Sequence, residues 1–179
     1  METSSGLEVK QQRQSAKLYG YYESPIGRLL LVGREGVLEA LYFPNATATL
    51  AVPAEWVEDD AAFAEPLRQL GEYFAGKRQE FELAIDPQGT PFQQEVWQEL
   101  RRIPFGKTAS YQAIAERLGR PKACRAVGMA NARNPLPIII PCHRIIGKNG
   151  TLTGFGGGLP VKRQLLELER GPLPSLWGK

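Results

Sequence analysis

The residues with the greatest capacity for chemistry are a cysteine and a histidine that are adjacent in the sequence. Cys142 and His143 lie in the run IIIPCHRII at 138–146, and His143 is the only histidine in the 179 residues. A thiol attacks as its thiolate and titrates near ~8.5, so an imidazole that accepts its proton would activate it as a nucleophile. The alternative is an inert buried thiol beside a histidine that caps a strand.

The flanking segments predict how this pair is held. The run NPLP at 134–137 predicts an extended, turning segment, and Ile138–Ile140 predicts a buried strand that leads to Cys142. Neighbouring side chains on an extended chain point apart, so contact between Cys142 and His143 requires a turn or a bridging water. The glycine-rich loop Gly154–Gly158 can bring backbone N–H groups close to a ligand, but it lacks the Lys-Ser/Thr pair of a phosphate-binding loop.

A carboxylate is a candidate third member of the site. Glu169 falls near the C-terminal end of the last predicted helix, where the helix dipole disfavours its charge by ~0.3–1 kcal/mol. His143 is the obvious compensating partner, in the arrangement of nucleophile, base and acid that activates cysteines. A solvated glutamate is the alternative, and nothing local selects Glu169 over Glu167.

Composition excludes several classes of protein. Two cysteines rule out a disulfide framework, and two cysteines with one histidine make a poor zinc site. The sequence contains no signal or transit pattern and no apolar run of membrane length. These features predict a cytoplasmic protein without a metal or a membrane partner.

Charge divides the chain into two unequal halves. Residues 1–88 carry 8 Lys and Arg against 14 Asp and Glu, a net charge of −6. Residues 89–179 carry 14 against 5, a net charge of +9. An asymmetry of this size favours a second half that meets a polyanion, although surface charge also varies without function.

The hydrophobic pattern predicts an α/β (α+β) fold with two domains. A polar lead-in at 1–16 is expected to be disordered, and a small sheet domain with one helix follows at 17–88. The charge changes sign at the turn cluster 86–89, where we place the domain boundary. Residues 89–170 are predicted to be mainly helical, and 171–179 form a proline-containing tail. Strands are expected at 18–22, 28–32, 37–43 and 81–85, and helices at 62–75, 91–103, 111–118, 122–131 and 160–169.

Two of these helices have the outline of a helix-turn-helix, with a break at Gly119. On the second helix, Cys124, Val127 and Gly128 are expected to pack inward. The opposite face carries small and basic side chains that would let the helix backbone approach DNA closely; they are Arg125, Ala126, Ala130 and Arg133. Ordinary helix packing is the alternative.

The second half of the sequence resembles the O6-alkylguanine-DNA alkyltransferases. The run PCHR at 141–144 after three isoleucines resembles the active-site motif of that family. Further matches run in a consistent order from Phe92 to about Glu169, and they comprise Val96-Trp97, Ile103 to Gly106, Ser110-Tyr111, Arg125 to Gly128, Asn134-Pro135, the glycine loop and Lys162. The first half is compatible with the variable N-terminal domain of the family.

The resemblance implies a direct-reversal DNA repair protein whose partner is duplex DNA containing O6-alkylguanine. Cys142 would accept the alkyl group, His143 would take the thiol proton through a water, and Glu169 would orient the imidazole. Asn134 would be the hinge that ties the helix-turn-helix to the active-site strand. No cofactor is implied, and the protein would be a monomer that can cluster along DNA.

The resemblance also implies how the substrate is handled. Arg125 would enter the duplex in place of the extruded nucleotide, and Tyr111 would assist extrusion and contact the base. The backbone at Cys142, Ile145 and Gly156 would read the guanine edge. The N-terminal zinc ligands of some members are absent here. Phe155 replaces a common tyrosine and Gly156 replaces a serine, so side-chain hydroxyl contacts at these positions do not carry over.

Two other functions fit parts of the sequence. A module that binds alkylated DNA without transfer would use the same surface, but its relatives carry another residue in place of the cysteine. A cysteine hydrolase would use Cys142, His143 and Glu169, but it would leave the basic half and the helix-turn-helix unexplained.

Overall fold

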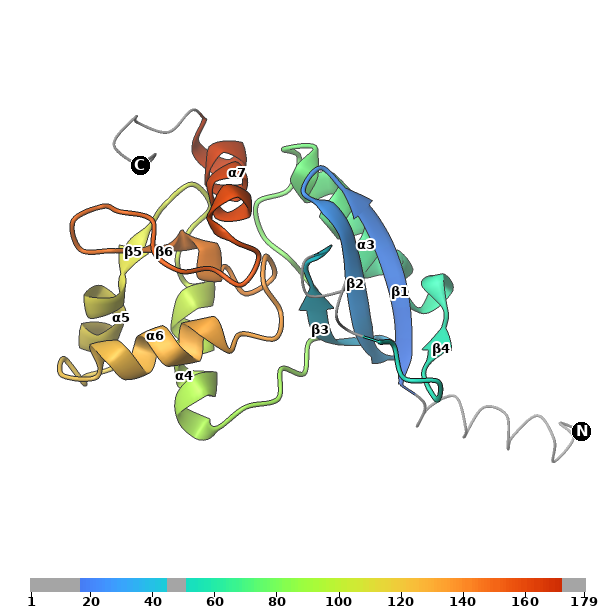
Figure 1. Cartoon of the computed structure of the whole chain (residues 1–179), viewed down its shortest axis with the longest axis horizontal. Helices are drawn as coiled ribbons and strands as arrows, with labels where there is room; N and C mark the ends of the chain where they lie inside the picture. The colour runs from blue at the N-terminus through green and yellow to red at the C-terminus, as the bar shows by residue number, and fades with distance from the viewer. Residues whose placement is uncertain (1–16, 45–50, 172–179) are drawn as a thin grey trace, which may run out of the picture.

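The computed structural model describes residues 17–44 and 51–171, and these residues form two lobes that lie side by side (Figure 1). The expected disordered lead-in at 1–16 and all but the first residue of the expected tail lie outside the described residues. One lobe contains the larger sheet and helix α3, and the other contains α4 to α7. This is the mixed α/β architecture that the hydrophobic pattern predicted.

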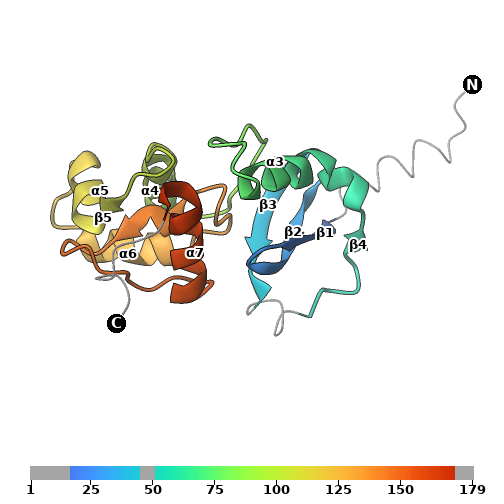
Figure 2. The ribbon, with the colours of Figure 1, turned by 90° about the horizontal axis from the view of Figure 1, so that it is seen from above.

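The N-terminal lobe is a four-stranded sheet covered on one face by a helix (Figure 2). The strands are β1 (Leu18–Ser24), β2 (Gly27–Arg34), β3 (Val37–Tyr42) and β4 (Val57–Glu58), in the order β3-β2-β1-β4. Only the pairing of β1 with β4 is parallel. A 3-10 turn, η1 (Asp60–Phe63), leads into α3 (Ala64–Phe74), whose residues Leu70 and Tyr73 are fully buried in the main core.

The strand predicted at 81–85 does not form. The segment makes one isolated bridge, between Leu38 and Ile85, at the outer edge of β3. Further along that edge, the backbone N–H of Leu41 donates to the carbonyl of Pro135 at 2.8 Å, so the edge is shared with the other lobe. The alternation that suggested a strand arises because Phe81 and Leu83 pack against the core from an irregular segment.

The C-terminal lobe contains four helices and a short parallel strand pair. The helices are α4 (Pro91–Arg101), α5 (Tyr111–Arg117), α6 (Cys124–Ala132) and α7 (Leu159–Arg170). The strands are β5 (Ala109–Ser110) and β6 (Ile145–Ile146), and η2 (Cys142–Arg144) is a 3-10 turn before β6. Helices α4, α5 and α6 pack against one another, and residues 118–123 connect α5 to α6. Among the described residues, no helix is long and apolar enough to cross a membrane.

Side-chain caps set the starts of α4 and α5, which lie at the positions expected for these two helices. The backbone N–H of Gln93 donates to Thr90 Oγ1 at 3.3 Å, and the Gln93 side chain accepts from the Thr90 N–H at 2.8 Å. Ser110 caps α5 through the N–H of Ala113 at 3.0 Å. These caps satisfy N–H groups that have no partner within the helix, so they fix where each helix begins.

We expect Thr90→Ala to lower the free energy of unfolding by ~1 kcal/mol, because the substitution removes the acceptor of the capping box. Urea unfolding of the full chain measures this loss. Thr90→Ser is the matched control, since it keeps the hydroxyl and should stay close to the wild type. Equal losses for the two variants would contradict a capping role.

Candidate active site

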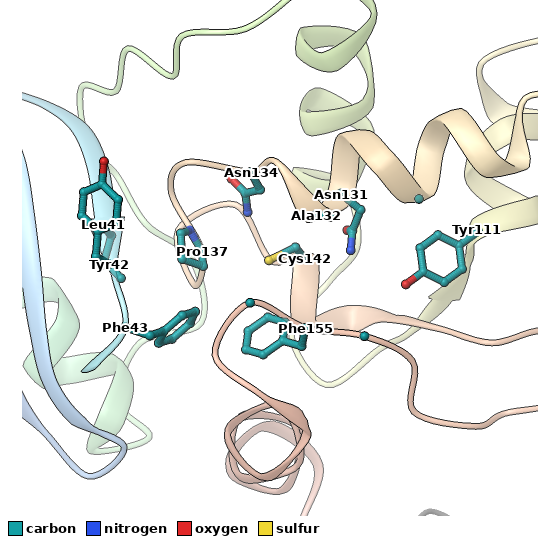
Figure 3. A pocket seen from close by; sticks show the side chains of 13 residues that line it. Leu41, Tyr42, Phe43, Tyr111, Asn131, Ala132, Asn134, Pro137, Cys142 and Phe155 are labelled. Carbon is teal, nitrogen blue, oxygen red and sulfur yellow. The ribbon is translucent and has the colours of Figure 1, made fainter. Parts of the chain in front are cut away.

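Cys142 lies in a cavity of about 530 Å³ between the two lobes (Figure 3). It begins the turn η2 and is 5% exposed. The cavity is lined by residues of β3, α5, α6, the segment around Pro137 and the glycine loop; they include Tyr42, Phe43, Tyr111, Asn131, Asn134, Pro137, Phe155 and Gly156. The size of the cavity is in the range of small-ligand sites.

The segment that leads to Cys142 is a buried turn and not the predicted strand. Ile138 adopts a φ of 76°, a left-handed conformation that strains a β-branched residue. The N–H of Ile140 bonds back to the carbonyl of Leu136 at 2.8 Å and closes the turn. The isoleucines are buried as predicted, but Pro135 and Pro137 supply no N–H groups for a strand ladder.

Asn134 fixes this turn from the end of α6. Its Nδ2 donates to the carbonyl of Ile140 at 2.8 Å, and its Oδ1 accepts from the N–H of Leu136 at 3.0 Å. Both bonds end on backbone atoms a few residues before Cys142. Asn134 therefore connects the chain just after α6 to the turn that precedes the thiol.

The Cys142 thiol is protonated at rest. Burial raises its pKa to about 11, although a hydrogen bond from Asn134 and the charge of Lys162 act in the opposite direction. Desolvation disfavours the thiolate because a buried charge loses its hydration. A resting ion pair between Cys142 and His143 is therefore not what this environment favours, and the thiol must lose its proton as it reacts.

His143 is fully buried and bonded through its far nitrogen. Its Nε2 lies 2.7 Å from Glu169 Oε1, while Nδ1 is buried and has no partner among the residues that the structure describes. Burial lowers the pKa of His143, although Glu169 acts to raise it, so the imidazole is neutral near pH 7. With the proton on Nε2, Nδ1 carries the lone pair that can accept the proton of the thiol.

Glu169 is the acidic residue that α7 directs into the core. Its carboxylate is flanked by Arg144, whose Nε donates to Oε2 at 2.9 Å and whose Nη2 donates to Oε1 at 3.0 Å. Burial alone would raise the pKa of Glu169, but hydrogen bonds and charges from His143 and Arg144 outweigh burial and hold it at about 2. The sequence could not separate Glu169 from Glu167, and the structure buries the former and leaves the latter half-buried.

The backbone at Gly106 also binds Glu169. Its N–H donates to Oε2 at 3.1 Å. Gly106 adopts a φ of 71°, and a Cβ added there would lie 2.9 Å from the carbonyl oxygen of Glu169. This position therefore requires glycine for both its conformation and its close approach to α7.

Lys162 is a buried cation beneath the site. Its Nζ donates to the carbonyl of Ile145 at 2.5 Å and to that of Thr153 at 3.0 Å, which ties β6 to the segment before the glycine loop. Burial lowers its pKa to about 8. The hydrophobic pattern alone did not predict that this lysine is buried. The signal that could have indicated its burial was its position beside Val161 on the apolar face of α7.

The residues predicted to bind the substrate base are brought together in part. Tyr111, Cys142 and Gly156 line the cavity, and the Tyr111 hydroxyl lies 2.8 Å from Thr153 Oγ1. Ile145 is fully buried and does not line the cavity. Among the described residues, no cluster of three or more His, Cys, Asp or Glu could hold a metal ion.

Sequence reasoning missed the contribution of the N-terminal lobe. Leu41, Tyr42 and Phe43 line the cavity from β3 and the residue after it. The ring centroids of Phe43 and Phe155 lie 5.2 Å apart, so the two lobes share an aromatic wall (Figure 3). No local pattern in the sequence could assign these residues to the site, because they reach it only through the docking of the lobes.

The outer face of α6 differs from the predicted one at one position. Arg125 and Ala126 are exposed, as predicted, but Ala130 is 2% exposed and its carbonyl accepts from Trp97 Nε1 at 2.9 Å. The prediction that Ala130 faces outward is wrong, because Val127 and Ala130 share the inward stripe at helical spacing. Met129, at 59% exposure, takes that place on the outer face.

Both lobes match one family of known proteins. Residues 17–87 match the 6-O-methylguanine DNA methyltransferase ribonuclease-like domain, and residues 91–171 match the 6-O-methylguanine DNA methyltransferase DNA binding domain. The methylated-DNA--protein-cysteine methyltransferase of Methanosarcina acetivorans is 50% identical over 151 residues, which cover 84% of this chain and 97% of that protein. The protein of that name from Mycolicibacterium paratuberculosis is 48% identical over 163 residues, covering 88% and 94%.

A solved structure agrees with these matches. Mycobacterium tuberculosis OGT in complex with DNA is 48% identical and superposes with a TM-score of 0.80, covering 86% of this chain and 92% of that chain. The O6-methylguanine-DNA methyltransferase of Pyrococcus kodakaraensis, at 21% identity and a TM-score of 0.60, shares the fold. The chain therefore belongs to the 6-O-methylguanine DNA methyltransferase family.

Proposed function

We propose that this protein repairs DNA by transferring the alkyl group of O6-alkylguanine to Cys142. The observation that carries the proposal is a buried cysteine that lines a cavity and is followed by a histidine held by a buried carboxylate. The names of the relatives support the substrate class. A free thiol must be kept reduced for this purpose, which favours the cytoplasm as the compartment.

The chemistry follows from the protonation states of the site. The Cys142 thiol passes its proton through a water to His143 Nδ1, and Glu169 stabilises the imidazolium that forms. The sulfur attacks the alkyl carbon, and the bond between that carbon and O6 breaks. The electron pair of this bond remains with the guanine, which takes up the proton that His143 had accepted. The product is a thioether that water does not hydrolyse at a useful rate, so each molecule reacts once.

A base inside a duplex gives this nucleophile no line of attack, so the modified nucleotide must leave the stack. Extrusion costs a few kcal/mol, which contacts in the cavity and an inserted side chain recover. Arg125 on the exposed face of α6 is the side chain we assign to the vacated position, with Ala126 beside it. Tyr111 and the backbone at Cys142 and Gly156, which line the cavity, would then bind the base.

We expect the protein to gain the mass of one alkyl group when it is mixed with duplex DNA containing O6-methylguanine. Intact-protein mass spectrometry measures a gain of one methylene, which should be absent from Cys142→Ala. Cys124→Ala is the matched control, since Cys124 is the other cysteine of the chain and should be dispensable. A gain that persists in Cys142→Ala would contradict the assignment, and repeated turnover on an ester substrate would favour a hydrolase.

We expect Arg125→Ala to slow repair of duplex DNA by about tenfold or more and to leave the reaction with free O6-benzylguanine nearly unchanged. The free base needs no extrusion, so only the duplex reaction depends on an inserted side chain. Single-turnover rates with the two substrates give the comparison. Arg101→Ala removes an exposed arginine from α4 and controls for net charge. Equal losses with both substrates would rule out the insertion role.

We expect Glu169→Gln to lower the free energy of unfolding by about 3–5 kcal/mol at pH 7, because Arg144 would be left without a counter-charge. The folded pKa of Glu169 is about 2 against an ordinary value of 4.5. Its stabilisation is therefore present above the ordinary value and is lost as the pH falls toward 2. Urea unfolding should show a smaller difference in the free energy of unfolding between wild type and Glu169→Gln at pH 4 than at pH 7.

Glu167→Gln is the control for that variant, because it removes the neighbouring, half-buried carboxylate of the same helix. It should change stability by less than about 1 kcal/mol at both pH values. A difference between wild type and Glu169→Gln that is independent of pH would contradict a charged role for Glu169.

A further inference from the structure

One hydrogen bond to the active-site carboxylate comes from the other lobe. Tyr73, on α3, donates its hydroxyl to Glu169 Oε1 at 2.8 Å, across 96 positions of sequence. Tyr73 is fully buried, and so is the side chain of Glu169. Helices α3 and α7 belong to different lobes (Figure 2), so this hydrogen bond crosses the boundary between the lobes. The N-terminal lobe therefore contacts the carboxylate that holds the imidazole.

The hydroxyl of Tyr73 and the imidazole of His143 share one oxygen atom. Glu169 Oε1 lies 2.8 Å from Tyr73 Oη, 2.7 Å from His143 Nε2 and 3.0 Å from Arg144 Nη2. The other oxygen, Oε2, accepts only from Arg144 and from the backbone of Gly106 among the described residues. Each donor to Oε1 withdraws negative charge from the oxygen that binds the imidazole of His143. The Tyr73 hydroxyl and the His143 imidazole therefore compete for the negative charge of this oxygen.

The Tyr73 ring is fixed by aromatic neighbours from both lobes. Its centroid lies 5.3 Å from Phe74, 5.4 Å from Phe81 and 6.1 Å from Phe105, with edge-on or tilted geometry. Phe105 follows α4 in the C-terminal lobe. The Tyr73 ring therefore packs at the boundary between the lobes, against aromatic side chains of both. A ring held on several sides keeps its hydroxyl directed at Glu169.

We infer that Tyr73 is a positioning residue for the proposed transfer, through which the N-terminal lobe sets how strongly Glu169 holds the imidazole of His143. This inference rests on the proposed function, and it lets a residue of the N-terminal lobe act on the proton acceptor His143 through Glu169. The hydroxyl weakens the pull of the carboxylate on the imidazole proton, so that His143 stays neutral and ready to accept the proton of the thiol.

The other charged groups around His143 give the sign of the expected effect. Arg144 and Lys162 act to lower the pKa of His143, as burial does, and Glu169 alone acts to raise it. Cys142 is neutral. Removing the Tyr73 hydroxyl leaves more negative charge on Oε1, so the pKa of His143 should rise while the two cations stay in place.

The test is Tyr73→Phe in the full chain, because it removes the hydroxyl and keeps the ring. Tyr22→Phe is the matched control: Tyr22 is a tyrosine of the same lobe that stacks on Phe74, 6.0 Å away. The first measurement is the rate of alkyl transfer from free O6-benzylguanine across pH, which needs no DNA binding. The second is the pH dependence of the imidazole resonances by NMR, which belong to His143 alone because the chain has one histidine.

Tyr73→Phe should shift the acid limb of the rate profile upward by about half a pH unit or more, with a parallel shift of the His143 resonance. At a fixed pH on the acid limb the rate should fall by about two- to tenfold, and Tyr22→Phe should match the wild type in both measurements. A uniform loss of rate at every pH with an unmoved His143 resonance would assign Tyr73 to packing alone and overturn the inference, as would profiles that coincide with the wild type. If the wild type transfers no alkyl group, the proposed function fails, and the NMR comparison still decides the role of Tyr73.

Discussion

The site depends on the burial of one carboxylate, that of Glu169. A buried carboxylate persists in its charged form only when donors replace its lost hydration, and here Tyr73, His143, Arg144 and Gly106 supply them. These donors come from α3, from η2 and from the turn after α4. Groups of both lobes therefore donate to the two carboxylate oxygens of Glu169, and this network orients the imidazole of His143.

Local signals predicted the elements well because each element has a local cause. Thr90 and Ser110 cap α4 and α5, and both helices start where the hydrophobic pattern placed them. The predictions failed where tertiary contacts outweighed local preference. The segment 81–85 alternates because it packs on the core, and Ile138 takes a strained conformation because Asn134 and the flanking prolines close a turn.

The candidate site was predictable in its chemistry but not in its full membership. The adjacency of Cys142 and His143, the motif around them and Asn134 pointed to the reactive group and its support. Phe43 and Tyr73 could not be found in this way, since each reaches the site through the docking of one lobe on the other. The environment of Cys142 also corrects the simplest expectation for a reactive thiol, because burial keeps it protonated.

That protonated thiol has a consequence for how long the protein remains usable. Oxidants and soluble electrophiles react with exposed thiolates, and a thiol that is 5% exposed with a raised pKa presents neither property. A protein that reacts once is lost to its purpose if its sulfur is oxidised before it meets DNA. The burial that makes Cys142 a weak nucleophile at rest thus also protects its sulfur from oxidation until the protein meets DNA.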